Sequence, residues 1–490
     1  MEGQPSFKKL VWLLLPVLGA AMFTTGCQTY EQKNKVISYW RRGDIPGAVN
    51  EATDKANQNA DSKDAIVWRL EQGAALRAAG QFEKSNQAFD QAQEKIDDYA
   101  QKADVRLGQE TAALLSNQAN LAYEGRSYDG IMLNTYEALN YLAMGEPDKA
   151  RPEIIRAYQR QEDAVQANQR RIEKAKDAAA DSKDSKTIDK AEADSKFQTA
   201  VQNSMSGINN IRVYADYVNP FTVYLDGLFF MADATDASDL ERAHKSLERV
   251  ASVVPENSYV QADIATVNDL IDGKPLPPTT YVIFETGCAP IRGQARIDIP
   301  IILSKVSYVG AAFPTLLPQG DFQPMLTVAA DGKDYRTEPV ASMDSMVALD
   351  FKNEMPVVIT KTVAATVTKA VAAYALNDTG RQGGDIVGLL AQFATTAYEM
   401  AVNIADTRTW TTLPKEFQIC RLPTPADGKI ELSTPNGMKV AVTLGASTGA
   451  KNDLTSDNAQ ATLNSGRPVS VVYVKSITSG TPLIVSQFKL

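Results

Sequence analysis

Histidine and cysteine are scarce in this sequence, which has one His and three Cys among 490 residues. It contains no CxxC, HExxH or GxxxxGK[ST] pattern. Zinc, haem and iron–sulfur centres draw their ligands mainly from these two residue types. His244 lies between Ala243 and Lys245 in a segment predicted to be helical, without a metal or catalytic partner. We therefore predict no cofactor, no metal site and no catalytic residue, and we expect that the protein is not an enzyme.

The sequence also has no excess of positive charge. Lys and Arg total 50 against 59 Asp and Glu, which gives a formal net charge of -9. Nucleic-acid partners need a basic surface, so they are not expected. The hydrophobic fraction of 44% is ordinary for a globular protein, and the length suffices for two or three domains.

The N-terminus carries an uncharged run from Leu10 to Phe23, preceded by two lysines and followed by Thr24-Thr25-Gly26-Cys27. The run is shorter than the ~20 apolar residues of a spanning helix. The two lysines, the apolar run and the small residues follow one another in the order of a secretory signal. The Cys that ends this segment is typical of a lipobox. We predict a signal peptide at 1–26 and lipidation (diacylglycerol and an amide-linked chain such as palmitate) at Cys27; a plain signal peptide or a short anchor is the alternative. Gln28 favours the outer membrane, facing the periplasm.

The other two cysteines, Cys288 and Cys420, would reside in an oxidising compartment where a disulfide can form. Their spacing does not decide whether they pair. Both have apolar neighbours, and a free Cys packs as a small hydrophobe. This favours two buried thiols.

Residues 27–272 have the pattern of a helical repeat domain. Around Gly80 and Gly145, small and aromatic residues recur at the spacing of tetratricopeptide (TPR) helix pairs, and looser matches surround Gly227 and Gly43. We predict a TPR-like α-solenoid, with an irregular helical bundle as the alternative.

A charged stretch interrupts these repeats. Between 170 and 196 the only large apolar residues are Ile172 and Ile188, so the stretch cannot bury a face. We predict an exposed helical hairpin at about 165–197 with a loop near Ala178; a docking arm is the alternative.

The pattern changes at 273–280, where Pro275, Pro277 and Pro278 predict an extended linker. Residues 281–490 contain short alternating segments and the turn pairs Asp331-Gly332, Asp427-Gly428 and Asn436-Gly437. They predict a small antiparallel β-sandwich. The expected fold class is multidomain α+β, an α-solenoid followed by this β-rich domain.

Two long helices are predicted within the β-rich half, at 356–376 and 385–405. Pro356 suits a first helical turn. The segments are rich in Ala, Thr and Val, so a membrane hairpin is conceivable. Lys361 and Lys369 in the first segment make insertion costly, and packing against the sheet is preferred.

Four stretches carry a resemblance to a known family: YLAMGEPDKAR (141–151), NPFTVYLDG (219–227), YVIFETGCAP (281–290) and ADTRTWTTLP (405–414). The chain resembles bacterial envelope lipoproteins with TPR-like helices in the first half and a β-rich second half, a largely uncharacterised family. The resemblance implies an envelope protein with a helical interaction half. It implies no active-site residues.

We therefore expect a lipid-anchored, protein-binding scaffold or accessory factor in envelope assembly, secretion or cell-wall maintenance. Its periplasmic or outer-membrane protein partner should occupy the concave surface formed by first helices. The candidate contact residues are Trp68, Arg69, Gln72, Arg77, Asn134, Glu137 and Asn140. The alternative is an enzyme or ligand-binding module acting on cell-wall glycan or peptide through a C-terminal pocket, for which the candidates are Glu285, Arg292, Asp406 and Arg408.

Overall fold

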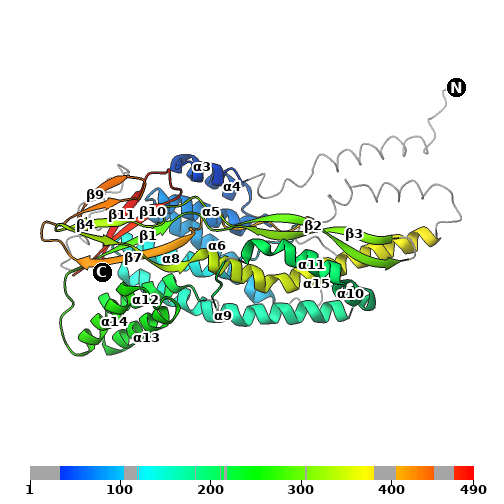
Figure 1. Ribbon diagram of the computed structural model, residues 1–490, viewed down its shortest axis with the longest axis horizontal. Helices are drawn as coiled ribbons and strands as arrows, with labels where there is room; N and C mark the ends of the chain where they lie inside the picture. Colours follow the sequence, from blue (N-terminus) through cyan, green and yellow to red (C-terminus); the bar gives the residue numbers. More distant parts are fainter. Residues whose placement is uncertain are drawn as a thin grey trace, which may run out of the picture.

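A computed structural model shows a mixed α+β protein, about 53% helical and 20% strand, with helices mainly in the N-terminal half and sheets in the C-terminal half (Figure 1). The structure describes residues 34–103, 119, 121–181, 184–209, 211–214, 218–303, 306–379, 404–445 and 468–490. The lipobox and residues 385–403 of the helix predicted at 385–405 lie outside them, and residues 404 and 405 are not helical. Within the described residues, no helix combines the length and apolarity that crossing a membrane requires.

The helices of the N-terminal half follow one another in packed pairs. Their bounds are α3 (Val36–Arg41), α4 (Ile45–Gln58), α5 (Ala65–Ala78), α6 (Phe82–Ala103), α8 (Ser127–Ala143), α9 (Pro147–Ala180), α10 (Ser185–Glu192), α11 (Ser195–Ser204), α12 (Pro220–Ala232), α13 (Ala237–Val253) and α14 (Ser258–Ile271). Gly80 and Gly145 have positive φ at the turns of the α5/α6 and α8/α9 pairs, a conformation that glycine adopts without strain. Gly227 lets α12 approach α13, since a Cβ atom there would lie 2.8 Å from Leu247 Cγ.

The C-terminal half contains two sheets that pack face to face. One has the strand order β11-β10-β1-β7-β6 and the other β5-β4-β8-β9. Their strands are β1 (Thr279–Thr286), β4 (Thr327–Ala330), β5 (Lys333–Arg336), β6 (Glu338–Ser342), β7 (Glu416–Pro423), β8 (Lys429–Ser433), β9 (Lys439–Thr443), β10 (Val469–Ser476) and β11 (Ile484–Lys489). Phe284, Val328 and Leu432 belong to the apolar cluster between the sheets. The sandwich was predicted as antiparallel, but β1 pairs with β10 in parallel.

Local turn chemistry is as expected in this half. Strands β4 and β5 form the predicted hairpin around Asp331-Gly332, and both residues have positive φ. Two such residues suit the turn that matches the twist of paired strands. Cys288 and Cys420 are free and buried, as predicted.

The five-stranded sheet is covered on its second face by the helices. Tyr281, Ile283 and Val471 on that face belong to the same apolar cluster as the core of α5, α8 and α12. All residues of β1 are buried, as expected for a strand between two layers. Residues 274–278 have no regular secondary structure, as predicted for the linker at 273–280, but β1 already begins at Thr279. The chain on both sides of this stretch contributes to one core.

A long arm extends from this body along the longest axis (Figure 1). It consists of α9, α10, α11, the hairpin of β2 (Ile291–Leu303) and β3 (Val306–Leu317), and α15 (Met343–Thr379). The predicted helical hairpin is present, since α9 ends at Ala180 and α10 begins at Ser185. It is not wholly solvated, because α10 packs against α15 and β2 and buries Ile188. The helix predicted at 356–376 begins at Met343, so Pro356 lies in its interior; buried Phe351 and Val358 stabilise the helix on both sides of the proline.

Candidate functional site

The seven residues predicted to form a concave partner surface lie mainly in the interior. Trp68, Gln72, Asn134, Glu137 and Asn140 are buried, whereas Arg69 and Arg77 are intermediate. The prediction of an accessible groove through these side chains therefore requires correction. Arg77 donates to Asn140 Oδ1 at 2.5 Å and stacks on the rings of Tyr136 and Tyr473. Arg69 donates to Gln72 Oε1 at 2.7 Å.

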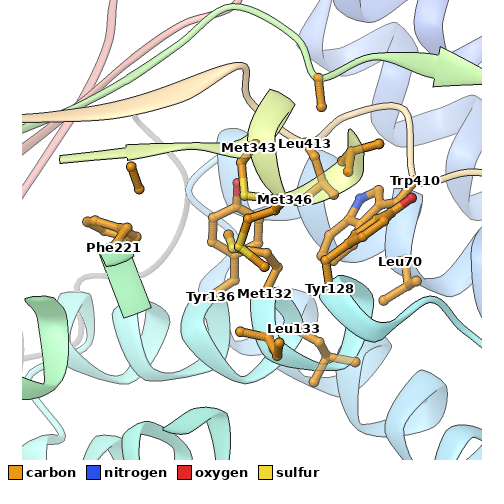
Figure 2. Close-up of a cluster of buried hydrophobic side chains, with 14 of the residues drawn as sticks. Leu70, Tyr128, Met132, Leu133, Tyr136, Phe221, Met343, Met346, Trp410 and Leu413 are labelled. Carbon is orange, nitrogen blue, oxygen red and sulfur yellow. The ribbon is translucent and has the colours of Figure 1, made fainter. Parts of the chain in front are cut away.

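The β-rich half occupies the surface that a partner was expected to fill. We call this contact the seam: α5 and α8 on one side, and β1, β10 and residues 404–415 on the other. Figure 2 shows Leu70 of α5, Tyr128 and Met132 of α8, and Trp410 and Leu413 pointing toward one another. Tyr136 and Trp410 meet edge to face, with ring centroids 5.8 Å apart. The first helices thus contact the chain's own sheet layer.

Glu285 marks the centre of the seam and is 1% exposed. It forms an ion pair with Lys475 and accepts a hydrogen bond from Tyr473, and Tyr136 Oη donates to its Oε1 at 3.0 Å. Burial acts to raise the pKa of Glu285, but the adjacent Lys475 ammonium and these hydrogen bonds bring the pKa below its ordinary value. Lys475 also lies 4.8 Å from the centroid of the Trp40 ring. The carboxylate is therefore held ionised and fully engaged.

Arg292, Asp406 and Arg408 meet in a separate network. Arg408 Nε lies 2.7 Å from Asp406 Oδ1, and Arg292 Nη2 lies 2.7 Å from Glu354 Oε2. Arg126 joins the two parts, since it pairs with Glu354 and Asp406. Glu285 takes no part. The four candidates for a C-terminal pocket are thus split between two sets of buried ion pairs, and neither lines the cavity described below.

Glu71 is a seam residue that sequence analysis missed. Its carboxylate accepts from the Thr411 amide at 2.7 Å, from Thr411 Oγ1 at 2.6 Å and from Thr412 Oγ1 at 2.8 Å. The signal was an acidic residue inside the apolar run AIVWRLEQGAALRA, since buried carboxylates need partners. These bonds attach residues 404–415 to α5.

Glu137 differs from these engaged carboxylates. It is buried, its Oε2 accepts from Asn134 at 3.0 Å, and its Oε1 has no hydrogen-bond partner among the residues that the structure describes. Burial and the nearby carboxylates of Glu153 and Asp90 raise its pKa to about 9.

The described residues contain no group of three His, Cys, Asp or Glu that could hold a metal ion.

An open cavity lies elsewhere, between α9 and α13, with a volume of about 450 Å³. We call it the α9/α13 groove. Its lining comprises Arg151, Ile155, Tyr158, Phe230, Ser238, Asp239, Glu241, Arg242, Lys245 and Ser246. Helices α9 and α13 lie on the side of the molecule opposite α3 (Figure 1). The groove is thus on an outer face, away from the seam.

Guanidinium groups and aromatic rings alternate along the groove. The Arg151 and Arg242 Cζ atoms lie 4.7 and 4.5 Å from the Phe230 centroid. The Arg242 and Arg249 Cζ atoms lie 5.5 and 5.4 Å from the Tyr158 centroid. All four distances are within the ~6 Å range of cation–π attraction. The order Arg151, Phe230, Arg242, Tyr158, Arg249 therefore forms a continuous stack, contributed by α9, α12 and α13.

Two carboxylates hold this stack in position. Asp239 pairs with Arg151 through two contacts of 3.0 Å, and these hydrogen bonds are the main cause that lowers the pKa of Asp239 to about 2. Asp226 accepts from Arg242 Nε at 3.0 Å and from Arg242 Nη2 and Ser246 Oγ. Burial raises the pKa of Asp226, although its bonds to Arg242 oppose the shift.

The groove also presents apolar surface to solvent. Ile155 is 41% exposed, although it is a large hydrophobic residue. Lys245 and Glu241 form an exposed ion pair at the rim. His244, the single histidine, is on the same helix and lies 3.5 Å from Glu248. Sequence analysis proposed none of the lining residues as a contact residue. The available signal was the spacing of Arg242 and Arg249, which places both on one face of α13.

Comparison with protein-family models, with curated proteins and with solved structures yields no match to this chain.

Proposed function

We propose that this protein is a lipid-anchored envelope lipoprotein whose helical half binds a partner protein in envelope assembly, secretion or cell-wall maintenance. Attachment is through Cys27 to the outer membrane, facing the periplasm. The sequence supports this proposal through the order of its N-terminal segment and through its resemblance to envelope lipoproteins with TPR-like helices. The partner is a periplasmic or outer-membrane protein.

The packing of the helices supports a TPR-like interpretation. The pairs α3/α4, α5/α6, α8/α9 and α12/α13 are the ones predicted around Gly43, Gly80, Gly145 and Gly227. Stacked pairs of this kind present two helical surfaces, one from the first helices and one from the second. The first surface contacts the β-rich half, so we assign partner binding to the second helices α9 and α13.

The observation that carries the proposal is the composition and exposure of the α9/α13 groove. Aromatic and arginine side chains are enriched at interfaces and supply most binding hot spots. Arg151 and Arg242 are 27% and 34% exposed, so a partner can reach them. The stack reduces the rotamer freedom that these long side chains would lose on binding. Binding of a partner at the groove should therefore cost little side-chain conformational entropy.

The alternative of an enzyme or ligand-binding module has no comparable support. Glu285 and Arg292 are buried, and each is engaged in an ion pair. A cell-wall glycan or peptide would have to displace these interior partners to reach either side chain. The alternative therefore needs a conformational change that the binding proposal does not need.

Site-specific photo-cross-linking in the native bacterium tests the proposal. A photoreactive phenylalanine analogue at Ile155 should give a discrete protein adduct in the membrane fraction. The same analogue at Ile271, which is 54% exposed at the end of α14, is the matched control and should give none. In a Cys27→Ser background the adduct should leave the membrane fraction or be lost. Equal labelling from both positions, or none from Ile155, would contradict partner binding at this groove.

A further inference from the structure

In the groove the arginines keep unused hydrogen-bond donors, whereas the acceptor positions of Asp239 and Asp226 are occupied. Asp239 accepts from both terminal nitrogens of Arg151 and from the Thr235 amide and hydroxyl. Asp226 accepts from Arg242 and from Ser246. A carboxylate has about four acceptor positions, so these two groups have little capacity left. The lining acceptor with capacity left is Glu241 at the rim, which is paired with Lys245.

The arginines have the opposite property. Each guanidinium has five N–H donors, and toward the described residues Arg242 uses only Nε and Nη2. Arg249 uses Nη1, which donates to Tyr158 Oη at 2.9 Å. Within the described residues Arg249 has no carboxylate within ion-pair distance, although its neighbours Arg242 and Lys245 each have one. Arg242 and Arg249, each with free donors, therefore both lie beside the Tyr158 ring.

The charge of the groove limits the size of the negative charge that it can accept. The acids Asp233, Asp236 and Asp239 gather at the Arg151 end. At the Tyr158 end Arg242 is paired with Asp226 and Lys245 with Glu241, so Arg249 leaves one positive charge there. A single carboxylate balances this charge, whereas a phosphate dianion or a polyanion would also meet repulsion from the acids. Guanidinium binds carboxylate well because two parallel hydrogen bonds can form.

We infer that the groove recognises a segment of the partner protein in which an Asp or Glu stands next to a large apolar residue. This inference rests on the proposed function and specifies its ligand. The carboxylate is bound by the free donors of Arg249 and Arg242. The apolar side chain packs against Ile155 and the exposed part of the stack, which places an apolar anchor beside a charged contact.

An array of C-amidated nonapeptides tests the inference with the full-length lipoprotein in detergent. The central pair is Asp–Leu, Asn–Leu, Asp–Ser or phosphoserine–Leu in a Gly/Ser background. We expect Asp–Leu to be retained about 10-fold more strongly than Asn–Leu, because a charge-assisted hydrogen bond is lost in the second peptide. Asp–Ser should also be weaker. Arg249→Ala should reduce Asp–Leu binding to the level of Asn–Leu, and Arg336→Ala on the exposed strand β5 should leave it unchanged.

The outcomes separate this inference from the proposed function. Asn–Leu or phosphoserine–Leu bound as strongly as Asp–Leu would overturn the ligand assignment, while an adduct at Ile155 would still support partner binding. If no peptide is retained, mass spectrometry of the Ile155 adduct decides: a cross-linked partner segment without an acidic residue beside an apolar one refutes the inference. Arg249→Gln and a thermal unfolding curve for each variant control for misfolding.

Discussion

The seam and the α9/α13 groove use the same residue types for different purposes. Both combine arginine or lysine with carboxylates and aromatic rings. In the seam these groups are enclosed: Glu285 is 1% exposed and its donors come from within the chain. In the groove Arg242 is 34% exposed and keeps donors that no atom of the described part of the chain accepts. Side-chain chemistry alone therefore does not identify a binding surface; exposure and unused hydrogen-bonding capacity do.

The comparison predicts opposite consequences for stability. A buried ion pair contributes little compared with a well-packed apolar pair, but removing one partner leaves an uncompensated charge and costs about 3–5 kcal/mol. Exposed pairs contribute about 0–1 kcal/mol. The seam should therefore be sensitive to single substitutions, and the exposed Lys245–Glu241 pair at the rim of the groove should tolerate them.

Dividing the chain between the two halves should have the largest effect. Fragments 28–272 and 279–490 each lose one side of the shared core, so the apolar faces of α8 and β1 become exposed to water. We expect neither fragment alone to unfold cooperatively in urea. Co-expressed fragments should associate and recover a single transition. Cooperative unfolding of the separate fragments would show that the Pro-rich stretch at 273–278 divides independent domains and that the seam is not required for folding.

The Glu285–Lys475 pair provides the next largest effect. Glu285→Ala should lower the free energy of unfolding by about 3–5 kcal/mol, because Lys475 is left buried without its carboxylate. Urea denaturation followed by circular dichroism measures this change.

Two controls sharpen the result. The double variant Glu285→Met with Lys475→Met should recover part of the loss, since no unpaired charge is left, while the Tyr136 and Tyr473 hydroxyls still lack their acceptor. Glu241→Ala, which breaks the exposed pair with Lys245 at the groove, should leave the curve unchanged. Equal losses for Glu285→Ala and Glu241→Ala would remove the distinction between seam and groove.

Much of the fold follows from local sequence patterns. The helix pairs around Gly80, Gly145 and Gly227 and the hairpin at Asp331-Gly332 were predicted because turns and close approaches demand particular residues at particular spacings. These signals act over a few residues. They identify elements and their immediate partners.

The candidate site could not be predicted in the same way. Trp68 and Asn140 have the residue types of an interface, but whether they face solvent depends on how the β-rich half docks, which no local pattern records. Tyr158 and Arg242 come from helices that are distant in the sequence, and their stack forms only when α9 and α13 meet. Ile188 was assigned to solvent because its own segment is polar, yet α15 and β2 provide its apolar neighbours.

The smallest expected effect concerns acid and the Arg151–Asp239 pair of the groove. The hydrogen bonds from Arg151 lower the pKa of Asp239 from 3.8 to about 2. A carboxyl whose folded pKa is depressed contributes stability above its unfolded pKa, and that contribution is lost as the pH falls through the folded value. The relevant window is therefore between pH 4 and pH 2.

Asp239→Asn should remove this part of the acid dependence. Because the Arg151 side chain is 27% exposed, solvent screening limits the change to about 1 kcal/mol at neutral pH. The variant should be slightly less stable than the wild type at pH 6, and the difference should shrink toward pH 2. Asp334→Asn on exposed β5 is the matched control and should parallel the wild type throughout. A decrease of several kcal/mol in the free energy of unfolding of Asp239→Asn would mean that the ion pairs of the groove stabilise the fold as those of the seam do. The main role of Arg151 would then be structural and not the binding of a partner.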